Sequence, residues 1–212
     1  MDFDGDGRLD LLSGSNCCDS AGLHLFRRNP NGSWAPRRRL EVTCPAGQFR
    51  EISVRRFVTA ADWNSDGVPD LLYTAEWDQG ILLALGPFKD NQPIPCSEKI
   101  ELKPEGFVAD FAVADWDGDG KPDLLVHKSL PGDVGGWGIY WYKNLGGPGV
   151  PKLAEGKLLV DFGSDRAAGF CVCDWNGDGR PDLVVTRTES VPVNREGTSW
   201  RQHGTVWLYL RE

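Results

Sequence analysis

Four short segments of the chain place acidic or amide side chains at every second position. They are DFDGDGRLD from Asp2, DWNSDGVPD from Asp62, DWDGDGKPD from Asp115 and DWNGDGRPD from Asp174. Carboxylates this close repel one another, and withdrawing them from water beside an apolar segment is costly unless a partner charge is present. A hard divalent cation is such a partner, since Ca²⁺ takes roughly 6–8 oxygen ligands in flexible geometry. The pattern therefore predicts four calcium-binding loops.

The nine positions of this motif divide into side-chain and main-chain donors. Positions 1, 3 and 5 offer side-chain oxygens, position 9 adds one from the start of the next strand, and glycines let the backbone fold around an ion. Position 7 varies between Arg, Val and Lys, as expected where only the main-chain carbonyl serves. Magnesium prefers octahedral geometry with retained waters, and zinc or iron would favour His or Cys. The alternative is a metal-free turn rich in Asp and Asn, which does not require three or four acids.

The segments around each motif are typical of β-strands. In the third repeat, apolar and β-branched residues over 107–115 and 123–128 predict buried strands on either side of the acidic loop. Residues 137–144 alternate aromatic and smaller side chains, and 156–160 form a short fourth run. The motifs recur 60, 53 and 59 residues apart. Four short antiparallel strands per repeat predict an all-β fold built from β-propeller blades, with the acidic loop between the first and second strands.

The composition is that of a folded, acidic chain. It has 212 residues, 40% of them hydrophobic and 25% charged, with a formal net charge of −8. An acidic balance disfavours nucleic acid, whose phosphates require a basic face. No apolar run approaches the roughly 20 residues that span a bilayer, so we expect no direct membrane insertion. An acidic motif follows Met1 at once, so we expect no leader peptide in this chain.

The repeats resemble FG-GAP repeats, also called VCBS repeats, which occur in integrin α-chain propellers and many bacterial surface proteins. DWDGDGKPDLLV followed by WYKNLGGPGVPKL is similar to the bacterial form over nearly a whole blade, and the likeness extends over essentially the entire chain. The resemblance implies up to four bound Ca²⁺ ions. Positions 1, 3, 5 and 9 would bind through side chains, and position 7 through its carbonyl oxygen.

The implied ligands are, in chain order, Asp2, Asp4, Asp6, Arg8 and Asp10; Asp62, Asn64, Asp66, Val68 and Asp70; Asp115, Asp117, Asp119, Lys121 and Asp123; and Asp174, Asn176, Asp178, Arg180 and Asp182. The second loop departs from the others by having Ser65 where they have glycine.

The expected blade boundaries are 1–53, 54–106, 107–166 and 167–212. The first blade would lack its inner strand and the fourth its outer strand, so the chain is predicted to form an open arc of about four blades. Because open arcs expose strand edges, we expect the partners of this arc to be the remaining blades of a longer chain, or further copies of itself.

The resemblance implies a calcium-binding module for binding or adhesion, located extracellularly, at the cell surface or in the periplasm, with a glycan or protein ligand. The loops between the second and third strands, at 13–22, 75–80, 128–136 and 186–204, are the candidate ligand surface. Two alternatives stay open: part of a secreted polysaccharide lyase or hydrolase built on a similar propeller, and a purely structural scaffold. Three scattered histidines and the lack of a nucleophile motif favour a non-enzymatic role.

Overall fold

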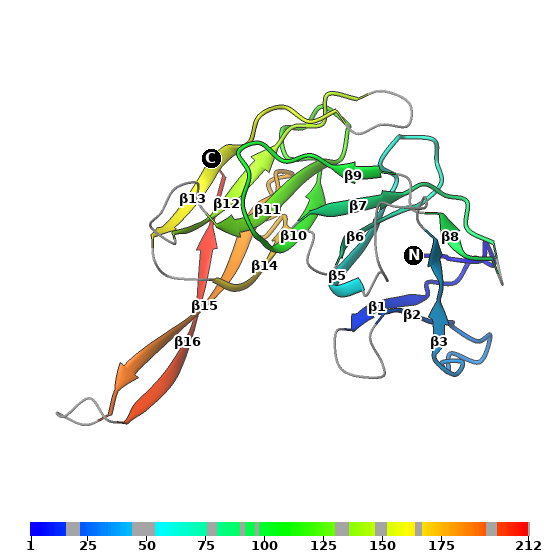
Figure 1. Ribbon diagram of the computed structural model, residues 1–212, viewed down its shortest axis with the longest axis horizontal. Coiled ribbons are helices and arrows are strands. Elements are labelled where there is room, and N and C mark those ends of the chain that lie inside the picture. Colours follow the sequence, from blue (N-terminus) through cyan, green and yellow to red (C-terminus); the bar gives the residue numbers. More distant parts are fainter. Residues whose placement is uncertain are drawn as a thin grey trace. The chain divides into compact units, whose positions relative to one another are not determined.

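The computed structural model describes residues 1–15, 22–43, 54–75, 80–89, 92–95, 98–129, 136–146, 152–163, 167–193 and 199–211 (Figure 1). Within these ranges every regular element is a β-strand, which confirms the prediction of an all-β chain. None of the described residues forms a helix that is both long and apolar enough to cross a bilayer.

The third repeat forms a four-stranded antiparallel sheet, with its strands side by side in sequence order (Figure 1). The strands are β10 (Val108–Ala114), β11 (Asp123–Ser129), β12 (Trp137–Tyr142) and β13 (Lys157–Gly163). They lie within a few residues of the runs that predicted them, because those runs are β-branched or aromatic and end at Gly, Pro or acidic turn residues.

The second repeat has the same four-stranded order, and the first and fourth repeats form three-stranded antiparallel sheets. The second sheet consists of β5 (Val54–Ala61), β6 (Asp70–Ala75), β7 (Ile81–Ala84) and β9 (Glu98–Ile100). The first consists of β1 (Leu11–Ser15), β2 (Gly22–Phe26) and β3 (Arg38–Leu40), and the fourth of β14 (Ala167–Cys173), β15 (Asp182–Pro192) and β16 (Trp200–Tyr209). A short parallel pair, β4 (Val42–Thr43) and β8 (Ile94–Pro95), joins the first two repeats.

The chain divides into two compact units, Met1–Leu102 with Leu145–Leu153, and Lys103–Asn144 with Ala154–Glu212. Each unit contains the sheets of two successive repeats. Successive side chains of a strand point to opposite faces, so each sheet can present an apolar face to its neighbour. In the first unit Leu25 packs in one cluster with Leu71 and Tyr73. In the second unit Leu125 packs with Leu183 and Val185.

The aromatic residue at position 2 of the first and third motifs belongs to this packing between neighbouring sheets. Phe3 lies in the core cluster that the first two repeats share, and Trp116 in the cluster shared by the last two. Phe3, Trp63 and Trp116 are 5%, 4% and 7% exposed, whereas Trp175 is 63% exposed. The same motif residue is therefore core in three repeats and surface in the fourth.

Candidate metal centre

The second, third and fourth acidic segments are each held closed by the strand pair that they connect. Ala114 pairs with Asp123, so position 9 lies directly opposite the residue that precedes position 1. The pairs Ala61–Asp70 and Cys173–Asp182 give the second and fourth loops the same register. Antiparallel pairing therefore brings the first and last acids of the motif together.

The aspartate at position 1 organises the loop from inside. In all four loops its two oxygens accept hydrogen bonds from the main-chain N–H groups of positions 5 and 6. For Asp2 the donors are Asp6 at 3.1 Å and Gly7 at 2.8 Å, and for Asp115 they are Asp119 at 3.0 Å and Gly120 at 2.9 Å. The N–H of Gly7 is the largest influence lowering the pKa of Asp2. Position 1 is thus held as an oriented carboxylate.

Position 5 forms a second local turn with position 7. One oxygen of Asp119 accepts the N–H of Lys121 at 3.0 Å, and Asp178 accepts that of Arg180 at 2.8 Å. Asp6 and Asp66 make the same contact, at 2.9 and 2.8 Å. Main-chain contacts therefore fix position 7 beside position 5 whatever its side chain is.

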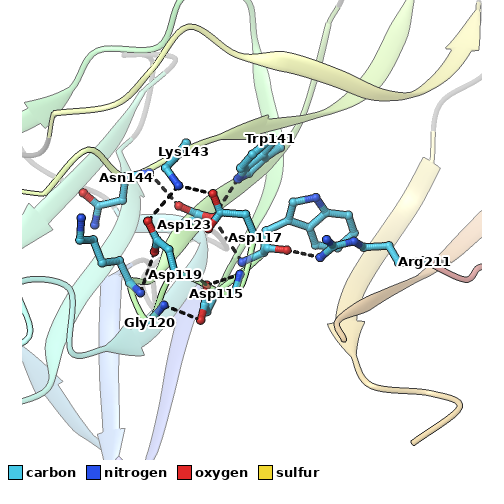
Figure 2. Close-up of polar contacts among 12 residues, drawn as sticks. Asp115, Asp117, Asp119, Gly120, Asp123, Trp141, Lys143, Asn144 and Arg211 are labelled. Carbon is cyan, nitrogen blue, oxygen red and sulfur yellow. Dashed lines mark hydrogen bonds and ion pairs between the residues drawn. The ribbon is translucent and has the colours of Figure 1, made fainter. Parts of the chain in front are cut away.

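The aspartate at position 9 connects the loop to the end of the third strand. Asp123 is fully buried; it accepts the N–H of Trp116 at 3.2 Å and the indole Nε1–H of Trp141 at 2.9 Å through Oδ2, and the N–H of Asn144 at 2.7 Å through Oδ1 (Figure 2). Burial raises the pKa of this carboxyl, and likewise that of Asp70.

The same two main-chain contacts recur in the other repeats. The N–H of position 2 binds Oδ2 of Asp10, Asp70 and Asp182 at 2.9, 2.9 and 3.0 Å. The N–H groups that bind Oδ1 belong to Arg28, Gly86 and Arg211, at 2.9, 2.8 and 2.8 Å. The sequence indicated position 9 only as a ligand position. The structure shows that it also joins three segments of its sheet.

Three acids converge in the first loop and three in the third. Asp2, Asp4 and Asp10 each offer a carboxylate oxygen, and these oxygens lie within 4.8 Å of one another. Asp115, Asp117 and Asp123 form the equivalent group. Asp6 and Asp119, the acids at position 5, are outside these groups. In the second and fourth loops position 3 is Asn64 or Asn176, so three acids cannot gather there in this way. The donors are all oxygens, which fits a hard cation such as Ca²⁺.

Ser65 adopts the backbone conformation that glycine has in the other loops. Its φ is +60°, against +76°, +78° and +77° for Gly5, Gly118 and Gly177. Left-handed backbone is strained for residues with a Cβ. The loop geometry is therefore preserved in the second repeat despite the less suitable residue.

Basic side chains reach the acidic loops from outside the motif, and the sequence analysis missed them. The Lys143 ammonium group pairs with Asp117 and, at 2.8 Å, with Asp119 (Figure 2). Arg27 pairs with Asp4 at 3.1 Å. Each of these residues directly follows the second strand after the acidic loop of its repeat. Lys143 follows β12 and Arg27 follows β2. A comparison of residue types at this point of the four repeats would have found them.

The loop predicted over 186–204 is instead largely strand, because β15 extends to Pro192 and β16 begins at Trp200, so the two strands form a long hairpin. Much of the remaining loop sequence lies outside the described residues. The segments concerned are 16–21, 76–79, 130–135 and 194–198. The glycan or protein ligand surface predicted there stays a prediction, as do the blade boundaries at 53, 106 and 166.

Comparisons with known proteins give one family and one distant structural likeness. A family model described as FG-GAP-like repeat matches residues 2–73 and 115–185, and each matched segment contains two acidic loops. A comparison with curated proteins finds no match. A solved chain, from a study of how an Agrocybe aegerita lectin recognises non-reducing terminal N-acetylglucosamine, aligns with a TM-score of 0.49 at 17% identity. The alignment covers 99% of this chain and 56% of that one, so this chain spans little more than half the length of that lectin chain.

Proposed function

The chain belongs to the family of FG-GAP-like repeats, and we propose that its four acidic loops are calcium sites within a non-enzymatic binding module. The module would consist of propeller-type blades and act outside the cytoplasm, on a glycan or protein ligand. That the chain is a repeat protein built from antiparallel β-sheets follows from the family match and the fold.

The observation that carries the calcium proposal is the convergence of three carboxylates in the first and third loops, within 4.8 Å of one another. Like charges at this separation repel, and the aspartate at position 9 is buried or nearly so. A divalent cation would convert that repulsion into attraction. Positions 1, 3, 5 and 9 would supply side-chain oxygens, and position 7 its carbonyl oxygen.

The residues of the chain already perform the positioning that such a site requires. Main-chain N–H groups orient position 1, and position 9 links the loop to the end of the third strand. A carboxylate has about four lone-pair sites, so an oxygen that accepts one N–H can still bind a cation. Bound calcium would supply positive charge at the point where three segments of the sheet meet, and would stabilise that sheet.

Thermal unfolding with and without a chelator tests the proposal. A ligand that binds only the native state stabilises it by about 2.7 kcal/mol per site at 100-fold excess over Kd, so EDTA should lower the melting temperature clearly. Magnesium at equal concentration serves as the control and should restore less of the loss. An unchanged melting curve in EDTA would reject calcium binding.

A pair of variants assigns the site. Asp115→Asn should remove about one equivalent of bound calcium in calorimetry, because position 1 contributes directly. Asp161→Asn makes the same chemical change on β13, where Asp161 accepts the N–H of Gly163 at 2.8 Å, and should leave the stoichiometry intact. Equal losses in both variants would contradict the assignment.

The proposal that the chain is a binding module needs a separate test. A glycan array and capture of protein ligands, each with calcium and with EDTA, would provide it.

A further inference from the structure

We infer that Lys143 and Arg27 are internal counter-cations of the third and first acidic loops, which offset one negative charge of each loop without metal and weaken calcium binding there. The inference deepens the proposed calcium function. Its second part, the weakening of calcium binding, rests on that function.

Lys143 lies against two of the acids that the third loop would use for metal. It follows β12 directly, and its ammonium group contacts the carboxylates of Asp117 and Asp119 together (Figure 2). All three side chains are only a quarter to a third exposed. A cation therefore already occupies the mouth of this loop.

Arg27 stands at the equivalent point of the first repeat. It follows β2, and its Nη1 lies 3.1 Å from Asp4, the position-3 acid. The next residue, Arg28, donates its N–H to Asp10, just as Asn144 donates to Asp123. The two basic residues thus share one structural position, immediately before the residue that binds position 9.

The residue at this structural position changes together with position 3 of the motif. In the second and fourth repeats it is Leu85 or Leu210, which precede Gly86 and Arg211, and position 3 is asparagine. Repeats with aspartate at position 3 have a basic residue there, and repeats with asparagine have leucine. The charge is counted over motif positions 1, 3, 5 and 9 together with this basic or leucine residue. Four carboxylates with one cation, or three carboxylates with none, then give every loop the same formal charge of −3.

The basic residues at position 7 do not explain this pattern. Arg8, Lys121 and Arg180 occur in the first, third and fourth loops, and Val68 in the second, so they do not follow the difference between Asp and Asn. Arg8 and Arg180 pair with the acid at position 5 of their own loops. Charge matching at position 3 is therefore a separate feature.

The consequence concerns calcium affinity. A divalent cation entering the third loop must displace the ammonium group from Asp117 and Asp119, and that group stays nearby as a like charge. The loops with four acids should therefore bind calcium no more tightly than those with three. Without calcium, the same two loops suffer less internal repulsion.

The test uses the full chain and Lys143→Leu, which gives the third repeat the leucine of the second and fourth. Calcium is titrated in competition with a chromophoric chelator, which resolves individual binding constants. We expect one site to bind about three- to tenfold more tightly, the effect of removing a like charge near a partly exposed site. In EDTA at low salt the same variant should melt at a lower temperature than the wild type, because Asp117 and Asp119 lose their counter-ion.

Three further variants isolate the mechanism. Leu210→Lys adds a cation to the fourth loop and should weaken one site severalfold. Asp117→Asn combined with Lys143→Leu gives the third loop the asparagine and leucine that the fourth loop has. This double variant should bring the calcium affinity of the third loop back to about the wild-type value. Arg201→Leu removes one positive charge from an exposed position on β16, eight residues along the strand from Tyr209 at the loop end, and should leave all constants within about twofold.

The outcomes separate this inference from the proposed function. A wild-type chain that binds calcium while Lys143→Leu binds equally or more weakly overturns the inference alone. A wild-type chain that gives no calcium signal rejects the proposed function and the calcium half of the inference. The melting temperatures in EDTA then test the counter-cation role by itself, since an unchanged melting temperature for Lys143→Leu would refute that role.

Discussion

At the scale of single residues, the repeats show how one motif tolerates different side chains. The backbone of every loop is held by the carboxylates at positions 1 and 5, so the glycines and Ser65 adopt the conformation that those contacts impose. The contacts stabilise the loop enough to offset a residue poorly suited to left-handed backbone. Local strain of this kind costs on the order of 1 kcal/mol.

Ser65→Gly should therefore stabilise the protein by about 1 kcal/mol in chemical unfolding, because glycine adopts positive φ without steric penalty. The reverse change at the equivalent position, Gly118→Ser, should destabilise by a similar amount. Open space surrounds the Cβ position at Gly118, so the cost would be conformational only. Equal stability of both variants and the wild type would show that the loop relaxes around either residue.

At the scale of elements, strands of neighbouring repeats meet through polar as well as apolar contacts. Asp110 lies on β10, accepts the N–H of Phe111 at 2.8 Å, and has its other oxygen 3.7 Å from the position that a Cβ of Gly169 on β14 would occupy. Burial raises the pKa of Asp110 to about 6. A carboxyl group partly buried between two strands is more easily protonated in the folded than in the unfolded chain.

This raised pKa gives a signed pH dependence. The folded state holds the Asp110 proton up to about pH 6, and the unfolded state releases it near 3.8, so ionisation at neutral pH disfavours the fold. The stability of Asp110→Asn minus that of the wild type should therefore increase between pH 4 and pH 7. Unfolding titrations across this range measure the difference, and a flat difference would mean that Asp110 is not shielded from water.

At the scale of the whole molecule, two features stand out: pairing of repeats within each compact unit, and a large excess of acid. In the second unit Trp116 packs against the fourth repeat, with the Arg211 guanidinium 4.6 Å from its ring centre and bonded to its carbonyl oxygen. Trp175, at the same motif position, is mainly exposed. The acidic loops contain 14 of the 31 acidic residues, and the formal net charge is −8.

Replacing the two tryptophans should have very different costs. Trp116→Ala removes a buried aromatic side chain from the cluster between two repeats, and should cost about 3–5 kcal/mol of unfolding free energy. Trp175→Ala changes a surface residue and should cost no more than about 0.5 kcal/mol. Similar losses in the two variants would show that the exposed face of the fourth repeat is covered in solution.

The acid excess predicts a salt effect that calcium removes. In EDTA, raising sodium chloride from about 10 mM to about 200 mM shortens the Debye length from roughly 30 Å to below 10 Å. Screening should then raise the melting temperature. With excess calcium the loops would already carry much less negative charge, so the rise should be smaller. Equal salt dependence in both conditions would argue that the loops do not take up calcium.

The sequence by itself determined the features that depend on neighbouring residues. Runs of β-branched and aromatic residues predicted the strands of the third repeat, and the motif spacing predicted the repeats and their acidic loops, because strand and turn preferences act over a few residues. The resemblance to FG-GAP-like repeats is likewise carried by contiguous motifs and was confirmed by the family match.

Only the tertiary structure decided which distant residues meet. Lys143 lies 26 residues from Asp117, and Arg211 lies 95 residues from Trp116; comparing the repeats can single out Lys143 as a basic residue, but only the structure shows which acids it contacts. The dual role of Asp123, and the burial of Trp116 but not Trp175, also depend on how strands and sheets pack. Long-range packing determines which charges share a loop and which side chains leave water, and a repeated motif cannot specify this because its four copies have different neighbours.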